Sequence, residues 1–253
     1  MTKVVTAALI IIGDEILSGR TQDVNLRYIA QRLNTIGVRL AEARVVADKQ
    51  DAIVAALNEC RQAYDYVMTT GGIGPTHDDI TAAAIAAAFG RPLIRNPEIV
   101  AILEDAYRDS GLELNEARLS MANTPEGATL INNPVSGAPG FQVENVFVFA
   151  GVPKIMQAMF ESMSHRLTGG APLLERSIVV DIGEGALAAD LEEIQNRHTN
   201  LSIGSYPYYR SGAFGVKLVL RGTDDTELDA AAEEVLTALR ALGGNPRIEE
   251  ATA

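Results

Sequence analysis

The chain has 253 residues, of which 47% are hydrophobic and 21% charged, the composition of a soluble globular protein with one large domain or two ordinary ones. Its net charge of -12 argues against general binding to nucleic acids or anionic membranes, since both depend on basic patches. The single cysteine, Cys60, excludes an internal disulfide and a cysteine-rich zinc site.

The first part of the chain alternates between predicted strands and predicted helices. The continuous apolar run at 4–12 predicts a central parallel strand covered on both faces, and residues 38–46 and 66–70 predict a second and a third strand. Apolar residues at helical spacing predict two helices between them, one closed by Gly37 and one with Cys60 on its buried face. This order predicts a parallel sheet with right-handed crossovers. The run 4–12 lacks a basic leader and is too short to span a bilayer, so we expect a cytoplasmic protein without membrane contact.

A glycine-rich loop follows the third predicted strand. Residues 69–81 read Thr-Thr-Gly-Gly-Ile-Gly-Pro-Thr-His-Asp-Asp-Ile-Thr and lead into an alanine-rich segment, which predicts a helix that begins near Asp78. Glycines let the backbone approach a ligand closely, and a helix N-terminus favours an anion such as phosphate. Two carboxylates, those of Asp78 and Asp79, are compatible with a phosphate ligand when a cation lies between the carboxylates and the phosphate. The alternative is that one of the two aspartates simply caps the helix, and spacing alone does not decide between these interpretations.

Polar residues also follow the other predicted strands. Asp14 and Glu15 come directly after the first strand, where they could bind a cation or a hydroxyl group, or only turn the chain in solvent. Asp48 follows the second strand, with helix capping as the competing role. Ligands of parallel sheets bind beyond the carboxyl ends of the strands, so these residues and the glycine loop are expected to converge on one pocket.

The remainder of the chain predicts more of the first domain and then a second one. Residues 97–122 predict helix, 132–140 a turn-rich loop, and 146–149 a buried strand. Gly151 and Pro153 after that strand repeat the strand–glycine–helix arrangement and are expected to form a second wall of the pocket. A linker is expected at 168–172. Beyond it the sequence predicts strands in which apolar and polar residues alternate, a helix at 187–198 and a last helix capped by Asp224-Asp225, which together suit a small α+β domain. We therefore divide the chain into domains 1–170 and 171–253.

The histidines and a second glycine motif indicate neither a histidine metal site nor a nucleic-acid site. No histidine pair has metal-ligand spacing, so a hard cation on carboxylates, such as Mg²⁺, is the expected metal. His77 is expected to be an exposed loop residue. Residues 212–215 match the G-x-x-G pattern of KH domains but read as a hairpin turn between two strands, so we expect no nucleic-acid partner.

Several of these motifs together resemble the MoaB/MogA molybdopterin-binding family, and most closely its CinA-like branch. Residues 13–19 are similar to the family's G-D-E-[IL]-L-x-G, Asp23 and Asn25 match its D-x-N, and 69–81 match T-T-G-G-x-G-P-T-x-D-D-x-T. The resemblance runs from about residue 4 to 165. Residues 175–245 resemble the small KH-like domain that follows in CinA proteins, whose C-terminal amidohydrolase domain is absent.

The resemblance implies a three-layer α/β/α fold with a mostly parallel sheet, followed by a small KH-like α+β domain. It implies a pocket for a phosphorylated pterin or a nucleotide diphosphate. In relatives, aspartates that match Asp48 and Asp79 support metal-assisted adenylyl transfer, and CinA-like relatives are associated with cleavage of ADP-ribose or FAD. Departures from the family pattern occur at 136–140, at 149–153 and at Ile155, where CinA proteins commonly carry glutamate.

We therefore predict hydrolysis of a nucleotide diphosphate of the ADP-ribose or FAD type with Mg²⁺ or Co²⁺, by a homo-oligomer. The alternatives are binding of molybdopterin without turnover, or adenylyl transfer to molybdopterin. The expected catalytic and metal-binding residues are Asp48, Asp78 and Asp79. The expected ligand contacts are Gly13, Asp14, Glu15, Thr70, Gly71, Gly72, Gly74, Pro75, Thr76, Ser136, Gly137, Ala138, Pro139, Gly151 and Pro153.

Overall fold

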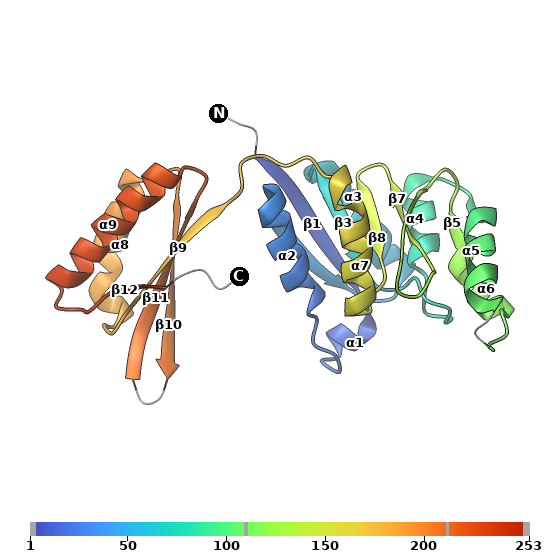
Figure 1. The fold of residues 1–253 in the computed structure, drawn as a ribbon, viewed down its shortest axis with the longest axis horizontal. Helices are drawn as coiled ribbons and strands as arrows, with labels where there is room; N and C mark the ends of the chain where they lie inside the picture. The colour runs from blue at the N-terminus through green and yellow to red at the C-terminus, as the bar shows by residue number, and fades with distance from the viewer. Residues whose placement is uncertain (1–3, 109–110, 211–212, 250–253) are drawn as a thin grey trace. The chain divides into compact units, whose positions relative to one another are not determined.

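The computed structural model describes residues 4–108, 111–210 and 213–249. The chain forms two compact units, Met1–Gly170 and Ala171–Ala253 (Figure 1). Within the described residues, no helix is both long and apolar enough to cross a membrane.

The first unit is built on a six-stranded sheet in the order β2-β1-β3-β8-β7-β6. The four strands from β2 to β8 run parallel, and β7 and β6 continue the sheet antiparallel. The strands are β1 Val5–Ile12, β2 Val38–Val46, β3 Tyr66–Thr70, β6 Thr129–Ile131, β7 Gly140–Val143 and β8 Val146–Phe149. The prediction of a mostly parallel sheet is confirmed, and its four predicted strands are the four parallel ones.

Helices cover both faces of this sheet. Leu9 and Ile11 of β1 pack with α2 (Asn25–Ile36) and α7 (Pro153–Met163), while Ile10 and Ile12 pack on the opposite face with α3 (Gln50–Ala63) and α4 (Thr81–Phe89). This alternation buries successive side chains of a fully apolar strand on opposite sides. The three-layer α/β/α prediction is therefore confirmed (Figure 1). Cys60 on α3 is buried, as predicted.

The region from residue 91 to 125 differs from the prediction of one helical stretch. It contains β4 Leu93–Arg95, α5 Pro97–Arg108, α6 Glu116–Leu119, the 3₁₀ turn η1 Ser120–Ala122 and β5 Asn123–Pro125. Gly111, with a φ of 71°, is incompatible with a continuous right-handed helix. Asn115 then starts α6 by accepting a hydrogen bond from the Arg118 amide at 3.0 Å. Residues 109–110 lie outside the described part of the chain.

The second unit pairs four antiparallel strands with two helices. Its strand order is β10-β11-β9-β12, with α8 and α9 packed on one face through Ile178, Leu218 and Val235. Its elements are β9 Leu174–Val180, α8 Glu184–Arg197, β10 Ser202–Arg210, β11 Ala213–Gly222, α9 Asp225–Ala241 and β12 Arg247–Glu249. The 3₁₀ turn η2, Ser164–Arg166, precedes them in the first unit. The predicted small α+β unit is confirmed.

Two details of this unit bear on the sequence predictions. Asp224 caps α9 as predicted, because its side chain accepts a hydrogen bond from the Glu227 amide at 3.0 Å. Of the predicted G-x-x-G turn, Gly212 lies outside the described residues, and Gly215 lies within β11 opposite Tyr208. β12 was not predicted, because its three residues are all exposed and carry no buried apolar pattern.

Candidate functional site

A cleft of about 580 Å³ opens at the carboxyl ends of the parallel strands. β2 lies on one side of β1 and β3 on the other, so the direction of the connections reverses beside β1. Such reversal points are where open α/β sheets bind ligands. The cleft brings together these predicted site residues: Gly13, Glu15, Asp48, Gly71, Gly72, Gly74, Pro75, Thr76, Asp78, Asp79, Ser136, Ala138, Gly151 and Pro153.

The glycine loop is held tightly against the end of β1. The Gly71 amide donates to the Phe149 carbonyl at 3.1 Å, and the buried Thr81 hydroxyl donates to the Gly71 carbonyl at 2.9 Å. Gly71 has a φ of 102°, and a Cβ there would lie closer than 3.0 Å to the Ile12 carbonyl oxygen. Only glycine satisfies both conditions. Because its amide is engaged, Gly71 shapes the loop and offers no free N–H to a ligand.

The next amides of the loop are better placed for an anion. Among the described residues, the amides of Gly72, Ile73 and Gly74 donate no hydrogen bond. Gly72 also has a positive φ of 68°, and its carbonyl accepts a hydrogen bond at 3.0 Å from the amide of Thr81, the first residue of α4. Successive free amides near a helix N-terminus form a concavity that suits phosphate oxygens.

Asp78 and Asp79 turn back onto the loop and do not cap the helix. α4 begins at Thr81, and its N-cap residue Ile80 makes no side-chain hydrogen bond. The helix start predicted near Asp78 and the capping alternative are therefore both wrong. The Thr76 hydroxyl oxygen lies 2.5 Å from Asp78 Oδ1 and 2.6 Å from Asp79 Oδ2, and the Thr76 amide donates to Asp79 Oδ2 at 2.8 Å. These bonds to the backbone and hydroxyl of Thr76 explain why the aspartates leave the helix end.

Two carboxylates therefore surround one hydroxyl group. A hydroxyl carries one proton and donates to one oxygen at a time. The bond from Thr76 is the main cause that lowers the pKa of the Asp78 carboxyl below its ordinary value. The Asp78 carboxyl consequently stays charged at neutral pH, and a cation beside it would be stabilised by that charge.

Asp48 is joined to the same cleft from β2. Its Oδ2 accepts a hydrogen bond from the Asp14 amide at 2.8 Å, and it does not cap α3, whose N-cap is Lys49. The capping alternative for Asp48 is therefore wrong. Burial raises the pKa of the Asp48 carboxyl, the Asp14 amide opposes the shift, and the charges of Asp14, Glu15 and Asp78 add to it. The acids of the cleft thus act on one another electrostatically.

Four predicted contact residues lie off the cleft lining. Asp14 contributes its amide to Asp48 while its side chain is exposed. Gly137 and Pro139 belong to the loop that presents Ser136, whose hydroxyl accepts a hydrogen bond from Asn133 Nδ2 at 2.7 Å. Thr70 lines a small adjoining cavity.

The cleft also has an apolar side that the sequence did not reveal as a unit. Its further lining residues are Ile12, Thr21, Ile73, Met121, Ala150, Val152 and Ile155. Met121 comes from η1, and no motif marks it. Ile155 was noted only as a departure from the family pattern, and here it is part of the wall.

In the part of the chain that the structure describes, the protein side chains alone do not assemble a complete metal site. Within the described residues, no group of three or more His, Cys, Asp or Glu side chains is placed to hold a metal ion. His77 is exposed in the loop, as predicted. A cation in this cleft would take one or two carboxylates and complete its shell with ligand oxygens and water, as Mg²⁺ usually does.

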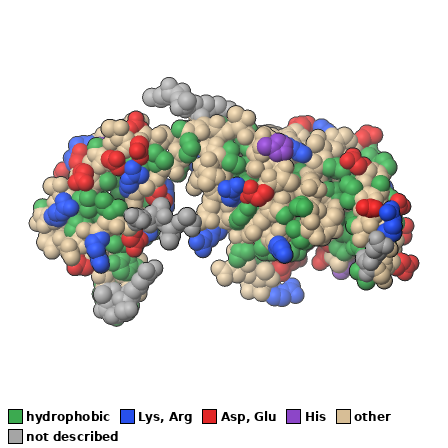
Figure 2. All heavy atoms as spheres, viewed as in Figure 1, with side chains coloured by type: hydrophobic (Ala, Val, Ile, Leu, Met, Phe, Trp, Pro, Cys, Tyr) green, Lys and Arg blue, Asp and Glu red, His purple; other side chains and the backbone are tan. Residues whose placement is uncertain are grey.

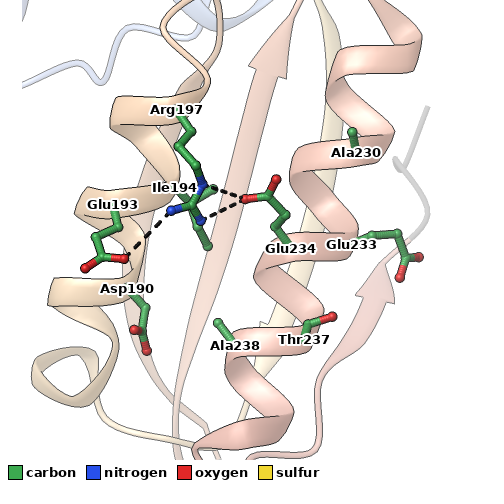
Figure 3. Close-up of a pocket in the computed structure, with 9 residues that line it drawn as sticks. All are labelled: Asp190, Glu193, Ile194, Arg197, Ala230, Glu233, Glu234, Thr237 and Ala238. Carbon is green, nitrogen blue, oxygen red and sulfur yellow. Dashed lines mark hydrogen bonds and ion pairs between the residues drawn. The ribbon is translucent and has the colours of Figure 1, made fainter.

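A second hollow, of about 530 Å³, lies between α8 and α9 of the second unit (Figure 3). Its lining includes the acids Asp190, Glu193, Glu233 and Glu234. Arg197, its cationic residue, is 2.9 Å from Glu234 and 3.7 Å from Glu193, so its charge is already paired. An acidic hollow does not suit a phosphate. On the face drawn in Figure 2, basic and acidic side chains are interspersed and form no basic patch.

The fold and the cleft define an α/β protein with a glycine-rich loop in a cleft at the carboxyl ends of its parallel strands. Residues 8–170 match the family model described as "Probable molybdopterin binding domain", and residues 172–243 match "FAD synthase, middle domain". The chain belongs to the molybdopterin-binding family of MoaB and MogA, in its CinA-like branch.

Individual relatives agree with this assignment. A protein of Metallosphaera sedula is 34% identical over 211 residues, covering 80% of this chain and 79% of its own length. A probable FAD synthase of Caenorhabditis elegans is 32% identical over 264 residues, which cover 94% of this chain and 50% of that protein. The crystal structure of the protein CinA, of unknown function, from Thermoplasma acidophilum aligns with a TM-score of 0.59 and 34% identity over 64% of this chain and 96% of that one.

Proposed function

We propose that the cleft binds a nucleotide diphosphate of the FAD or ADP-ribose type and hydrolyses its diphosphate bond with the help of a divalent cation. The observation that carries the proposal is the pairing of three free amides at 72–74 with two carboxylates that share the Thr76 hydroxyl. The amides suit phosphate oxygens and the carboxylates suit a cation. A metal–diphosphate ligand satisfies both at once.

The carboxylates of Asp78 and Asp79 are the groups that would hold the cation. They are hard oxygen donors on one short turn, which suits Mg²⁺ or Co²⁺, and the remaining ligand positions would be filled by phosphate oxygens and water. When bound, the cation neutralises charge on the phosphate oxygens.

Asp48 is suited to holding a water molecule. The Asp14 amide fixes Oδ2, and the raised pKa of the carboxyl makes Asp48 a stronger proton acceptor than an ordinary aspartate. We propose that it orients the water that attacks phosphorus and accepts its proton.

The apolar side of the cleft supports a ligand with a planar ring. Ile73, Met121 and Ile155 line the same space as the carboxylates, and an aromatic ring such as adenine or a flavin would bury itself against them. The similarity to the proteins named "Probable FAD synthase" of Caenorhabditis briggsae and Caenorhabditis elegans favours a flavin nucleotide as the first compound to test.

The test is Asp79→Asn, measured as AMP release from FAD and from ADP-ribose with Mg²⁺ or Co²⁺. We expect the wild-type protein to release AMP. The rate of AMP release by Asp79→Asn should be lower by a factor of about 100 or more, since the variant lacks one negative charge at the cation. Asp105→Asn is the matched control, because Asp105 is an exposed acid on α5 that pairs with Arg108. Equal rates in wild-type protein and Asp79→Asn would refute the proposal.

A second candidate function is binding of molybdopterin without turnover. The family description and the lack of a three-residue metal group among the described residues favour it. It predicts pterin fluorescence that copurifies with the protein, together with no AMP release from either diphosphate. Adenylyl transfer to molybdopterin, the remaining alternative, predicts instead that AMP from ATP becomes attached to the pterin.

A further inference from the structure

The loop between β6 and β7, residues 132–139, places Ser136 and Ala138 in the lining of the cleft. Its inner residue Asn133 is only 3% exposed, whereas Ser136 is exposed. The sequence predictions named Ser136 as a ligand contact but did not indicate which of its atoms would act, and they assigned no role to Asn133. The hydrogen bonds within the loop determine both.

The Asn133 side chain is bonded at both ends to its own loop. Its Oδ1 accepts hydrogen bonds from the amides of Val135 at 3.1 Å and Ser136 at 3.2 Å. Its Nδ2 donates to the Ser136 hydroxyl oxygen and to the Ala138 carbonyl, both at 2.7 Å. The Gly137 amide also donates to the Asn133 carbonyl at 3.1 Å. Together these bonds hold the loop, and Ser136 with it, in one conformation.

These partners determine which way the Asn133 amide points. A flipped amide would place its oxygen against the Ala138 carbonyl and its NH₂ group against two backbone N–H groups, so Nδ2 is the atom beside Ser136. The Ser136 hydroxyl oxygen is therefore the acceptor in that bond. A hydroxyl also has one proton to donate, and within the described residues the Ser136 hydroxyl donates it to no acceptor. The loop thus presents one free donor, on a side chain held in place, at the cleft.

Side chains that can donate hydrogen bonds are scarce in this cleft. Among the described residues, its lining contains four acids, including Asp78 and Asp79, and no lysine or arginine. The Thr76 hydroxyl is already engaged with those two aspartates. A negatively charged ligand would therefore need neutral donors in addition to a cation, and Ser136 is a donor that the protein's own hydrogen bonds leave available.

The neighbouring position is poorly suited to supply this hydroxyl. Gly137 has a φ of 82°, and an added Cβ there would lie 3.2 Å from Ala106 Cβ on α5. A side chain at 137 would be strained by the backbone and tightly packed against that helix, so the polar group of the turn is carried by Ser136.

We propose that the Ser136 hydroxyl donates a hydrogen bond to an acceptor atom of the nucleotide diphosphate in the cleft, and that Asn133 is the positioning residue that keeps Ser136 a donor. Asn133 does so by occupying the hydroxyl oxygen with its own N–H, which leaves the Ser136 proton for the ligand. This inference rests on the proposed nucleotide diphosphate function.

The test measures binding of adenosine 5′-(α,β-methylene)diphosphate with Mg²⁺ to the full chain by isothermal titration calorimetry. The P–C–P bridge of this probe is not hydrolysed, so no turnover contributes. Ser136→Ala should bind the probe about fivefold or more weakly than the wild-type protein, the order expected for one hydrogen bond. Ser136→Thr keeps the hydroxyl and should bind it within about twofold of the wild-type affinity. Ser164→Ala is the matched control, because the Ser164 hydroxyl donates to the Glu161 carbonyl at 3.2 Å and Ser164 does not line the cleft.

Asn133→Asp tests the positioning role. Its carboxylate can still accept from the amides of Val135 and Ser136, but it replaces the donor beside the Ser136 hydroxyl by an acceptor, which takes the Ser136 proton. In the Asn133→Asp background, Ser136→Ala should therefore change the affinity by less than about twofold. If Asn133 only stabilises the loop, Ser136→Ala should cost the same factor in both backgrounds. Thermal melting by circular dichroism checks that each variant is folded, and the Ser136 variants decide the donor role by themselves.

The outcomes distinguish this inference from the proposed function. Equal affinity of wild-type protein and Ser136→Ala, or a loss that Ser136→Thr shares, overturns the donor assignment and leaves the proposed diphosphate site standing. An undiminished effect of Ser136→Ala in the Asn133→Asp background overturns the role of Asn133. Absence of binding by the wild-type protein overturns the proposed function, and this inference with it. A loss in Ser136→Ala that is absent from Ser136→Thr and Ser164→Ala supports the donor assignment.

Discussion

Replacing Gly71 by alanine tests the geometry of the glycine loop most severely. The added Cβ would lie closer than 3.0 Å to the carbonyl oxygen of Ile12, a backbone atom at the end of the central strand β1. The residue would also have to keep a φ of 102°, which side chains rarely adopt. Neither the strand nor the loop can shift without breaking the Gly71–Phe149 and Thr81–Gly71 hydrogen bonds.

The expected loss of stability follows from these two effects. Holding a non-glycine residue in a sparsely populated conformation costs about 1–3 kcal/mol. Forcing a methyl group into a packed site costs about 1–3 kcal/mol more. The expected total, about 2–6 kcal/mol, is a large part of the stability of an ordinary domain. Gly90→Ala is the matched control, because Gly90 has a φ of 61° but an added Cβ there meets nothing within 4 Å. It should cost only about 1–2 kcal/mol.

Urea denaturation followed by circular dichroism measures both variants. Because the chain has two compact units, we expect two unfolding transitions. The change in the free energy of unfolding is taken from the transition of the first unit, which contains both glycines, and the transition of the second unit is an internal reference. We expect Gly71→Ala to lower the free energy of unfolding by clearly more than Gly90→Ala. Equal losses in the two variants would mean that the Ile12 carbonyl does not confine the loop, and would refute the reasoning.

Two further predictions concern single carboxylates. Burial raises the pKa of the Asp48 carboxyl, so the folded state holds that proton more tightly than the unfolded state and stability falls as the pH rises through the raised pKa. Asp48→Asn should therefore raise the melting temperature at about pH 7 and not at about pH 3, below the ordinary aspartate pKa, and a gain of the same size at both pH values would contradict this. Asp224→Ala removes the cap of α9 and should cost about 1 kcal/mol in urea denaturation, whereas Asp224→Asn should cost little. Equal losses in the two Asp224 variants would show that the cap hydrogen bond does not matter.

The centre of the sheet of the first unit was predictable because β1, β3 and β8 are buried on both faces. Such strands are continuous apolar runs, and 4–12 and 146–149 stand out in the sequence for that reason. The three-residue strands β4, β5 and β6 carry no comparable signal, because they are too short to show a period. Their pairing depends on the segments around them.

The location of the cleft was predictable from topology, but its internal bonding was not. Residues after β1, β2 and β3 meet because parallel strands end at one edge. The sequence could not show that Asp78 and Asp79 bind Thr76 and leave the helix uncapped, since aspartate is equally suited to either role. Nor could it show Met121, which tertiary packing alone brings to the cleft.

Two buried polar side chains near the cleft illustrate the same limit. Asn25 was visible as part of a family motif, but its unpartnered oxygen is a property of the folded structure. The position of Thr70 at the end of a strand does not reveal which face its hydroxyl occupies until the register of β3 is known.

The most direct measurement is hydrolysis of FAD by the wild-type protein in ¹⁸O-labelled water, with Mg²⁺ or Co²⁺ and with EDTA, followed by mass spectrometry of the phosphorylated products. Hydrolysis by attack at phosphorus with a cation in the cleft predicts AMP and FMN only when metal is present, with one ¹⁸O atom on a phosphate of the product pair. FAD that is bound but left intact with either metal, or AMP release that EDTA does not reduce, would contradict the central claim.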